Sequence, residues 1–211
     1  MTTFHSHPAT RQDRWVIEAL GGKRNGYFIE VGAHDGVHHS NTLTLEDHYG
    51  WGGVLIEGNT VLFDRLLNNR KTRLCLDRVI GDGFIASFVN GDSYGGLVKY
   101  MPPEWLREHA RRGNSAARVQ TYKLSDSLDY VRAPAIIDYL SLDAEGSELL
   151  ILNEILPSRY KFRCFTAEFR YDGALLREME ILANRCDYEL VECRAFDACF
   201  VHKYMRFIGA P

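Results

Sequence analysis

Short apolar runs suited to strands alternate along this chain with segments in which apolar residues recur at helical spacing. Runs rich in β-branched and aromatic residues predict strands at 27–31, 53–57, 72–80, 136–143 and 162–169. Helical spacing predicts helices at 12–20, 41–49, 59–69, from 125 onward, 149–156 and 174–185. This alternation is typical of a mostly parallel, doubly wound α/β sheet with helices on both faces. Two last runs, 188–193 and 198–202, predict an antiparallel C-terminal hairpin, so that the sheet has seven strands.

Residues 84–120 interrupt this alternation. An apolar run at 84–89, followed by Asn90-Gly91, is typical of a hairpin, and Pro102-Pro103 precedes a short helical segment. We expect an insertion over the ligand-binding edge of the sheet, where loops choose substrates. It carries four arginines that either hold a substrate phosphate or carboxylate or form a solvated basic face: Arg107, Arg111, Arg112 and Arg118.

Length and charge limit the classes of protein that the chain can represent. With 211 residues, 45% of them hydrophobic, we expect one domain (1–211), with an N-terminal tail and helix at 1–25. The net charge of -3 does not favour nucleic acid as a partner. No apolar run is long enough to span a membrane, no signal peptide is recognisable, and the five cysteines are odd in number. These features predict a cytoplasmic protein with free thiols, and they leave its oligomeric state open.

The stretch Tyr27 to Gly36 combines a strand, a glycine turn and the approach to a helix, which is the arrangement of a ligand site at a parallel sheet edge. Gly32 permits a sharp turn, and the helix start near Asn41 offers free N–H groups to a carboxylate. His34 stands where a dinucleotide fingerprint has its second glycine. The spacing therefore favours a nucleoside with a carboxylate tail, such as S-adenosylmethionine, over a pyrophosphate. An NAD-type oxidoreductase and a non-catalytic binding module remain alternatives.

Acidic residues end several of the predicted strands. Glu57 lies about 20 residues beyond the glycine turn, where nucleotide-binding βαβ units place the carboxylate that binds ribose. Asp82, between two glycines, either reaches the adenine amino group or serves the turn. The predicted cofactor site comprises Glu30, Gly32, His34, Gly36, Asn41, Glu57, Asp82 and Asp143.

The densest acidic cluster, Asp143-Ala-Glu145-Gly-Ser-Glu148, follows the strand at 136–143, and Glu168 ends the next strand. A carboxylate whose pKa is raised by its neighbours can act as a base toward an acceptor hydroxyl. Alternatively, two or three carboxylates can hold a divalent ion that acidifies the hydroxyl. Asp143, Glu145 and Glu168 are the catalytic candidates, and Asp143 and Glu168 are the candidate ligands for Mg²⁺. His34, His38 and His39 are alternative bases or make local hydrogen bonds, and His5 and His7 belong to a polar tail.

Four of these segments together resemble the FkbM family of S-adenosylmethionine-dependent methyltransferases: Phe28-Ile-Glu-Val-Gly-Ala-His-Asp-Gly36, Leu55-Ile-Glu57, Val79-Ile-Gly-Asp82 and Tyr139-Leu-Ser-Leu-Asp-Ala-Glu-Gly-Ser-Glu148. The resemblance implies a class I (Rossmann-like) methyltransferase fold and O-methylation of a carbohydrate, glycosylated or polyketide hydroxyl. It also suggests kinship to metal-dependent sugar O-methyltransferases. In that pattern Asp143 and Glu145 match an Asp-x-Asp pair, with Glu168 as a further ligand. The chain departs from it because Phe169, not a second acid, follows Glu168.

Overall fold

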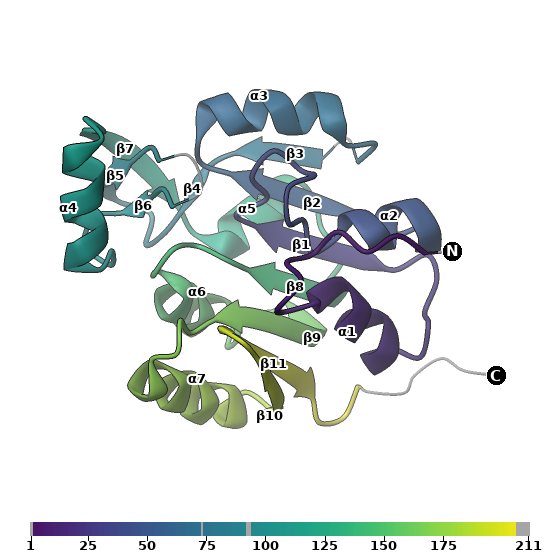
Figure 1. Ribbon diagram of the computed structural model, residues 1–211. Coiled ribbons are helices and arrows are strands. Elements are labelled where there is room, and N and C mark those ends of the chain that lie inside the picture. The colour runs from purple at the N-terminus through teal and green to yellow at the C-terminus, as the bar shows by residue number, and fades with distance from the viewer. Residues whose placement is uncertain (1, 73, 92–93, 206–211) are drawn as a thin grey trace.

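The computed structural model describes residues 2–72, 74–91 and 94–205 (Figure 1). Within them, seven strands form one sheet in the order β10-β11-β9-β8-β1-β2-β3. Their bounds are β1 Tyr27–Val31, β2 Gly52–Glu57, β3 Leu74–Asp77, β8 Ile136–Leu142, β9 Lys161–Glu168, β10 Tyr188–Arg194 and β11 Asp197–His202. Strands β3, β2, β1, β8 and β9 are parallel, whereas β11 runs antiparallel to both of its neighbours. The expected mostly parallel seven-stranded sheet with an antiparallel C-terminal hairpin is confirmed.

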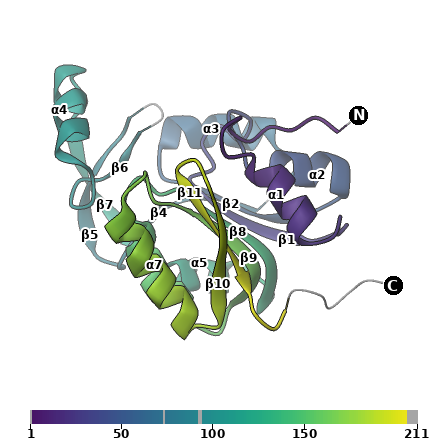
Figure 2. The same ribbon diagram turned by 60° about the horizontal axis from the view of Figure 1, so that its bottom comes forward.

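Helices cover both faces of this sheet (Figures 1 and 2). One face packs against α1 (Gln12–Ala19), α2 (Leu43–Tyr49) and α3 (Thr60–Asn69), the other against α5 (Leu124–Tyr130), α6 (Glu148–Ile155) and α7 (Gly173–Arg185). Successive side chains of a strand point to opposite faces, so Phe28 packs into the first core and Ile29 into the second. Burial on both faces explains why the strands read as continuous apolar runs rather than as alternating ones.

The strand expected at 72–80 is wrong as a single element, because it divides at Arg78. Its first part, β3, joins the main sheet, whereas β4 (Val79–Ile80) pairs with β7 (Ala116–Tyr122) in a second sheet ordered β4-β7-β5-β6. The expected hairpin is present as β5 (Ile85–Val89) and β6 (Gly96–Leu97), with Phe88 opposite Leu97. Helix α4 (Pro103–Arg111) follows. Strand β7 was not anticipated, because its exposed residues carry no apolar run.

The second sheet and α4 stand beside the carboxyl ends of the parallel strands, which point toward them in Figure 1. The loops that follow β1, β2, β8 and β9 therefore meet at one edge, with the insertion next to them. No helix in the described part of the chain is long and apolar enough to cross a membrane.

Candidate functional site

A cavity of about 480 Å³ opens at this edge of the sheet. Its walls come from the loops after β1, β2, β8 and β9, from the second sheet and α4, and from the N-terminal segment that contains His7. This volume lies within the range of small-molecule and cofactor sites, and the position is the one at which open α/β sheets bind ligands.

The glycine turn forms one wall of the cavity. Gly32 has a φ of 80°, and its N–H donates to the carbonyl oxygen of Ile56. Glu57 holds the turn from the neighbouring strand, because its carboxylate accepts the N–H groups of His34 at 2.8 Å and Asn59 at 2.7 Å. Burial raises the pKa of Glu57 despite these bonds. Gly32, His34 and Glu57 thus lie together, as a cofactor site would require.

Glu30 and Asn41 also line the cavity, but they are engaged in holding its wall. The buried carboxylate of Glu30 accepts the N–H of Asn41 at 2.8 Å, and the Asn41 amide donates to the Ser141 hydroxyl at 3.0 Å. Beneath the same loop, Arg70 has a fully buried side chain that donates to the Gly36 carbonyl oxygen and pairs with Glu46 at 2.9 Å. Arg70 was not predicted from the sequence, because an arginine at the end of a helix is usually exposed and no local pattern indicates that this one is buried.

Two predicted cofactor residues lie apart from this set. Gly36, with a φ of 79°, does not line the cavity, and an added Cβ there would collide with the side chains of Leu66 and Arg70. Asp82 also lies outside the lining, and its carboxylate accepts the Phe84 N–H at 3.2 Å. The structure therefore supports the turn interpretation of Asp82, and it gives Gly36 a packing function.

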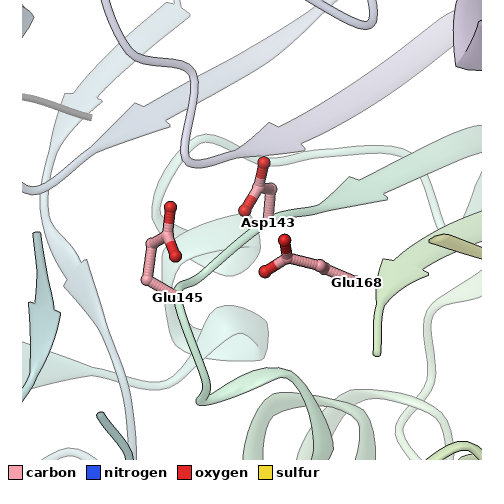
Figure 3. A group of neighbouring side chains, drawn as sticks. All are labelled: Asp143, Glu145 and Glu168. Carbon is pink, nitrogen blue, oxygen red and sulfur yellow. The ribbon is translucent and has the colours of Figure 1, made fainter. Parts of the chain in front are cut away.

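Three carboxylates converge beside the glycine turn, just after β8 and at the end of β9 (Figure 3). Oxygen atoms of Asp143, Glu145 and Glu168 all lie within 4.8 Å of one another. Burial, together with the charges of the other two acids, raises the pKa of Asp143 well above its usual value. Burial and Glu168 raise the pKa of Glu145 to about 8, although Arg170 acts in the opposite direction. One oxygen of Asp143, Oδ1, is enclosed and has no hydrogen-bond partner within the described chain.

The turn that carries Glu145 is held from both sides. Glu148, at the start of α6, accepts the N–H groups of Ala144 at 2.9 Å and Gly146 at 3.0 Å. From the insertion, Gly96 lies so close that an added Cβ would be 3.1 Å from the Cβ of Glu145. Glu145 itself has a φ of 54°, a conformation that persists only where the surroundings impose it. Glu148 therefore positions the turn, whereas α6 has Ser147 as its N-cap residue and no side-chain capping hydrogen bond.

Arg170 is the site residue that sequence reasoning missed most clearly. Its Nε donates to Glu168 at 2.6 Å and one terminal nitrogen donates to Glu145 at 2.5 Å. The guanidinium lies over the ring of Trp105, 4.3 Å from its centre, and thereby joins α4 to the carboxylates. Its place two residues after a strand-end acid was the only available signal.

The four arginines proposed as substrate ligands do not line the cavity: Arg107, Arg111, Arg112 and Arg118. Arg111 and Arg112 instead pair with Glu108 on the exposed side of α4, at 2.9 Å and 2.8 Å. The insertion contributes aromatic side chains to the cavity, with Tyr94 packed edge-on against Trp105 at 5.0 Å between ring centres.

A row of histidines completes the rim. The ring of His7 lies 4.6 Å from His39, His39 lies 3.9 Å from His38, and His38 lies 5.5 Å from His34. Burial, together with the neighbouring imidazoles, lowers the pKa of His39. His7 thus belongs to the cavity wall, although its sequence context indicated only a polar tail.

The antiparallel strand β11 brings a further acid to the site. Asp197 lies opposite Glu168 in the sheet register and accepts a hydrogen bond from the buried Gln12 of α1. Burial raises the pKa of Asp197 to about 7. An acid at the start of a strand reaches this edge only when that strand is antiparallel. Asp197 was therefore missed when candidate residues were sought at the carboxyl ends of parallel strands.

The three converging carboxylates are oxygen ligands of the kind that Mg²⁺ takes. However, Arg170 already binds an oxygen of Glu145 and an oxygen of Glu168. A divalent ion would have to share those two carboxylates with a guanidinium, at the cost of repulsion between two cations. The arrangement therefore does not fit a magnesium ion while Arg170 keeps its place.

The model of the methyltransferase FkbM domain matches residues 30–190. The chain belongs to the FkbM methyltransferase family. The resemblance identified from the sequence motifs is thereby confirmed, and the family match spans the glycine turn, Glu57, the acidic cluster and Glu168. No curated protein matches the chain in sequence.

Solved methyltransferase structures are similar to this FkbM-family protein, and the METTL16 MTase domain shares its fold. The METTL16 MTase domain is 14% identical, with a TM-score of 0.51 over 92% of this chain and 67% of that one. Precorrin-6y C5,15-methyltransferase from Geobacter metallireducens is 10% identical, with a TM-score of 0.47 over 90% and 84%. TYW2 from M. jannaschii, solved in complex with AdoMet, is 10% identical, with a TM-score of 0.42 over 90% and 74%. The class I methyltransferase fold is confirmed.

Proposed function

We propose that this protein transfers a methyl group from S-adenosylmethionine to a hydroxyl oxygen of a small-molecule or glycan acceptor, a carbohydrate or a glycosylated or polyketide metabolite. The observation that carries the proposal is the single cavity that joins the glycine turn, Glu57 and the carboxylates Asp143 and Glu145. Membership of the FkbM family supplies the reaction class.

The residues of the glycine-turn wall suit the cofactor. The unpartnered Oδ1 of Asp143 is an enclosed acceptor that suits an ammonium group, and Glu57 presents a carboxylate toward the position of a ribose. Gly32 supplies the positive φ of the turn, and its missing side chain leaves room for the Asp143 backbone. When bound, S-adenosylmethionine would supply a methyl carbon made electrophilic by the sulfonium charge.

The carboxylates suit the acceptor. A hydroxyl becomes a good nucleophile when a base removes its proton as the new C–O bond forms. Glu145 fits this base, because a pKa of about 8 lets it hold the proton near neutral pH and release it afterwards. Asp143 and Glu168 lie within reach of the same point and would orient the hydroxyl. The rings of Tyr94 and Trp105 suit a sugar or other ring stacked beside it.

Calorimetric titration with S-adenosylhomocysteine tests the cofactor, with NAD as the comparison that addresses an oxidoreductase. We expect binding of the homocysteine compound and none of NAD. Glu57→Gln should weaken binding about 10- to 150-fold, since a ribose–carboxylate hydrogen bond is worth about 1.5–3 kcal/mol. Asp77→Asn is the matched control, because Asp77 ends the adjacent strand outside the cavity. If the folded protein does not bind S-adenosylhomocysteine, the proposal is refuted.

An acceptor screen with labelled S-adenosylmethionine tests the base. Glu145→Gln keeps the size of the side chain and should lower methyl transfer about 10²–10⁴-fold without loss of S-adenosylhomocysteine binding. Glu104→Gln, on the exposed first turn of α4, should leave transfer unchanged. Full transfer by Glu145→Gln would remove Glu145 from this role.

A further inference from the structure

An arginine side chain of the protein is paired with the carboxylates that line the cavity. The Arg170 guanidinium spans two of them, since it donates from Nε to Glu168 and from a terminal nitrogen to Glu145. The other arginine that lines the described cavity, Arg78, lies 4.6 Å from the centre of the Tyr122 ring and donates to the Ser127 hydroxyl. Among the described residues, Arg170 is therefore the cation that contacts this cluster.

The position of Arg170 is fixed by several independent contacts. The N–H groups of Phe169 and Arg170 both donate to the Phe196 carbonyl oxygen, at 2.8 Å and 3.2 Å. Trp105 covers the face of the guanidinium. Arg170, with a φ of 51°, and its partner Glu145, with a φ of 54°, both adopt left-handed backbone conformations, which persist where the surrounding structure imposes them. The guanidinium is held in place before any ligand binds.

We propose that the Arg170 guanidinium takes the position of a divalent ion at Asp143, Glu145 and Glu168, so that the site functions without a metal and binds one only when Arg170 is removed. Arg170 already occupies one oxygen of Glu145 and one oxygen of Glu168. A second cation in the same cluster would also be repelled by the fixed charge. Arg170 is thus a positioning residue, which aims the Glu145 and Glu168 carboxylates into the cavity, and Trp105 fixes Arg170 in turn.

Metal titration of the purified chain, without cofactor or acceptor, tests this inference. The probes are Mn²⁺ followed by calorimetry and Tb³⁺ followed by luminescence that nearby tryptophan sensitises. The wild type should bind neither ion specifically. Arg170→Met, which keeps the length of the stem but removes the charge, should bind both at least about tenfold more tightly. Adding Glu168→Gln to Arg170→Met should abolish the gain, because it replaces one charged ligand.

Arg111→Met is the matched control, since Arg111 is an exposed arginine that pairs with Glu108 away from the cavity. It should behave as the wild type. If Arg170→Met does not fold, the wild-type titration alone still decides: specific Mn²⁺ binding by the wild type that Glu168→Gln removes would overturn the inference. Equal, weak binding by wild type and folded Arg170→Met would overturn it as well.

The consequence for catalysis rests on the proposed function and is measured separately. Methyl transfer by the wild type should be the same with EDTA as with added Mg²⁺. Loss of transfer in EDTA, restored by Mg²⁺, would refute metal independence. The metal titration needs neither S-adenosylmethionine nor an acceptor, so its result can be interpreted even if the protein methylates no hydroxyl. A failure of the inference about Arg170 can therefore be distinguished from a failure of the proposed function.

Discussion

Gly32 provides the most direct test of how the fold builds its cavity, through the substitution Gly32→Ala. The residue has a φ of 80°, and an added Cβ would overlap the carbonyl oxygen of Asp143 and lie 3.0 Å from its carbonyl carbon. Two separate penalties follow, because the left-handed conformation is unfavourable for alanine and the end of β1 would have to move away from β8. The same movement would displace Asp143 from the cavity.

The two penalties can be separated with Gly22→Ala. Gly22 has a φ of 73°, but an added Cβ there meets no atom within 4 Å. Gly22→Ala should therefore cost only the conformational term of about 1–2 kcal/mol. Gly32→Ala adds overpacking against a fixed backbone, typically another 1–3 kcal/mol or more, so we expect a total of about 2–5 kcal/mol. In a domain of this length, each kcal/mol lowers the Tm by about 2–4 °C.

Thermal unfolding and S-adenosylhomocysteine titration measure the two consequences. Gly32→Ala should lose more Tm than Gly22→Ala and should also bind the ligand at least about tenfold more weakly. Gly22→Ala should bind it as the wild type does, since Gly22 is not among the residues that line the cavity. If both variants lose the same Tm, the contact between the ends of β1 and β8 does not carry the cost, and the reasoning is wrong.

Two further substitutions test buried charges. Arg70→Ala leaves buried carboxylates unpaired and should cost about 3–5 kcal/mol of unfolding free energy in denaturant titrations, whereas Lys71→Ala, which breaks an exposed pair with Asp47, should cost less than about 1 kcal/mol. The folded pKa of Asp197, about 7, lies above its unfolded value of 3.8, so wild-type stability is lost as pH rises from about 4 to 7. Asp197→Asn should therefore raise the Tm at pH 8, by an amount that shrinks toward pH 4, and an equal gain at both pH values would contradict this.

The sequence predicted the main sheet well because both of its faces are buried. Its strands appear as dense apolar runs, and the intervening helices carry recognisable ends, such as Gly50, which adopts a φ of 70° after α2. The second sheet was harder to predict, since strand β7 is largely exposed and both of its partners, β4 and β5, lie well before it in the sequence. The division at Arg78 likewise depends on tertiary pairing, because the local sequence suits one continuous strand.

The residues of the candidate site that lie at the carboxyl ends of parallel strands could be predicted from the sequence. Glu57, Asp143, Glu145 and Glu168 come together because parallel strands bring their carboxyl ends to one edge. The same rule was applied to Asp82, which follows a short strand of the other sheet and lies outside the cavity lining, although Val79 and Ile80 of that strand line the cavity.

Arg70 and Arg170 show why residue type alone does not reveal function. Each arginine pairs with two carboxylates, Arg70 beneath the glycine-turn loop and Arg170 within the acidic cluster that lines the cavity. The Arg70 side chain is 0% exposed and lies outside the cavity lining, whereas Arg170 is 17% exposed and lines the cavity. Charge removal at Arg70 can therefore act only through the stability of the loop. Charge removal at Arg170 opens three carboxylates to whatever the cavity admits, so it should change which ligand binds more than it changes whether the protein folds.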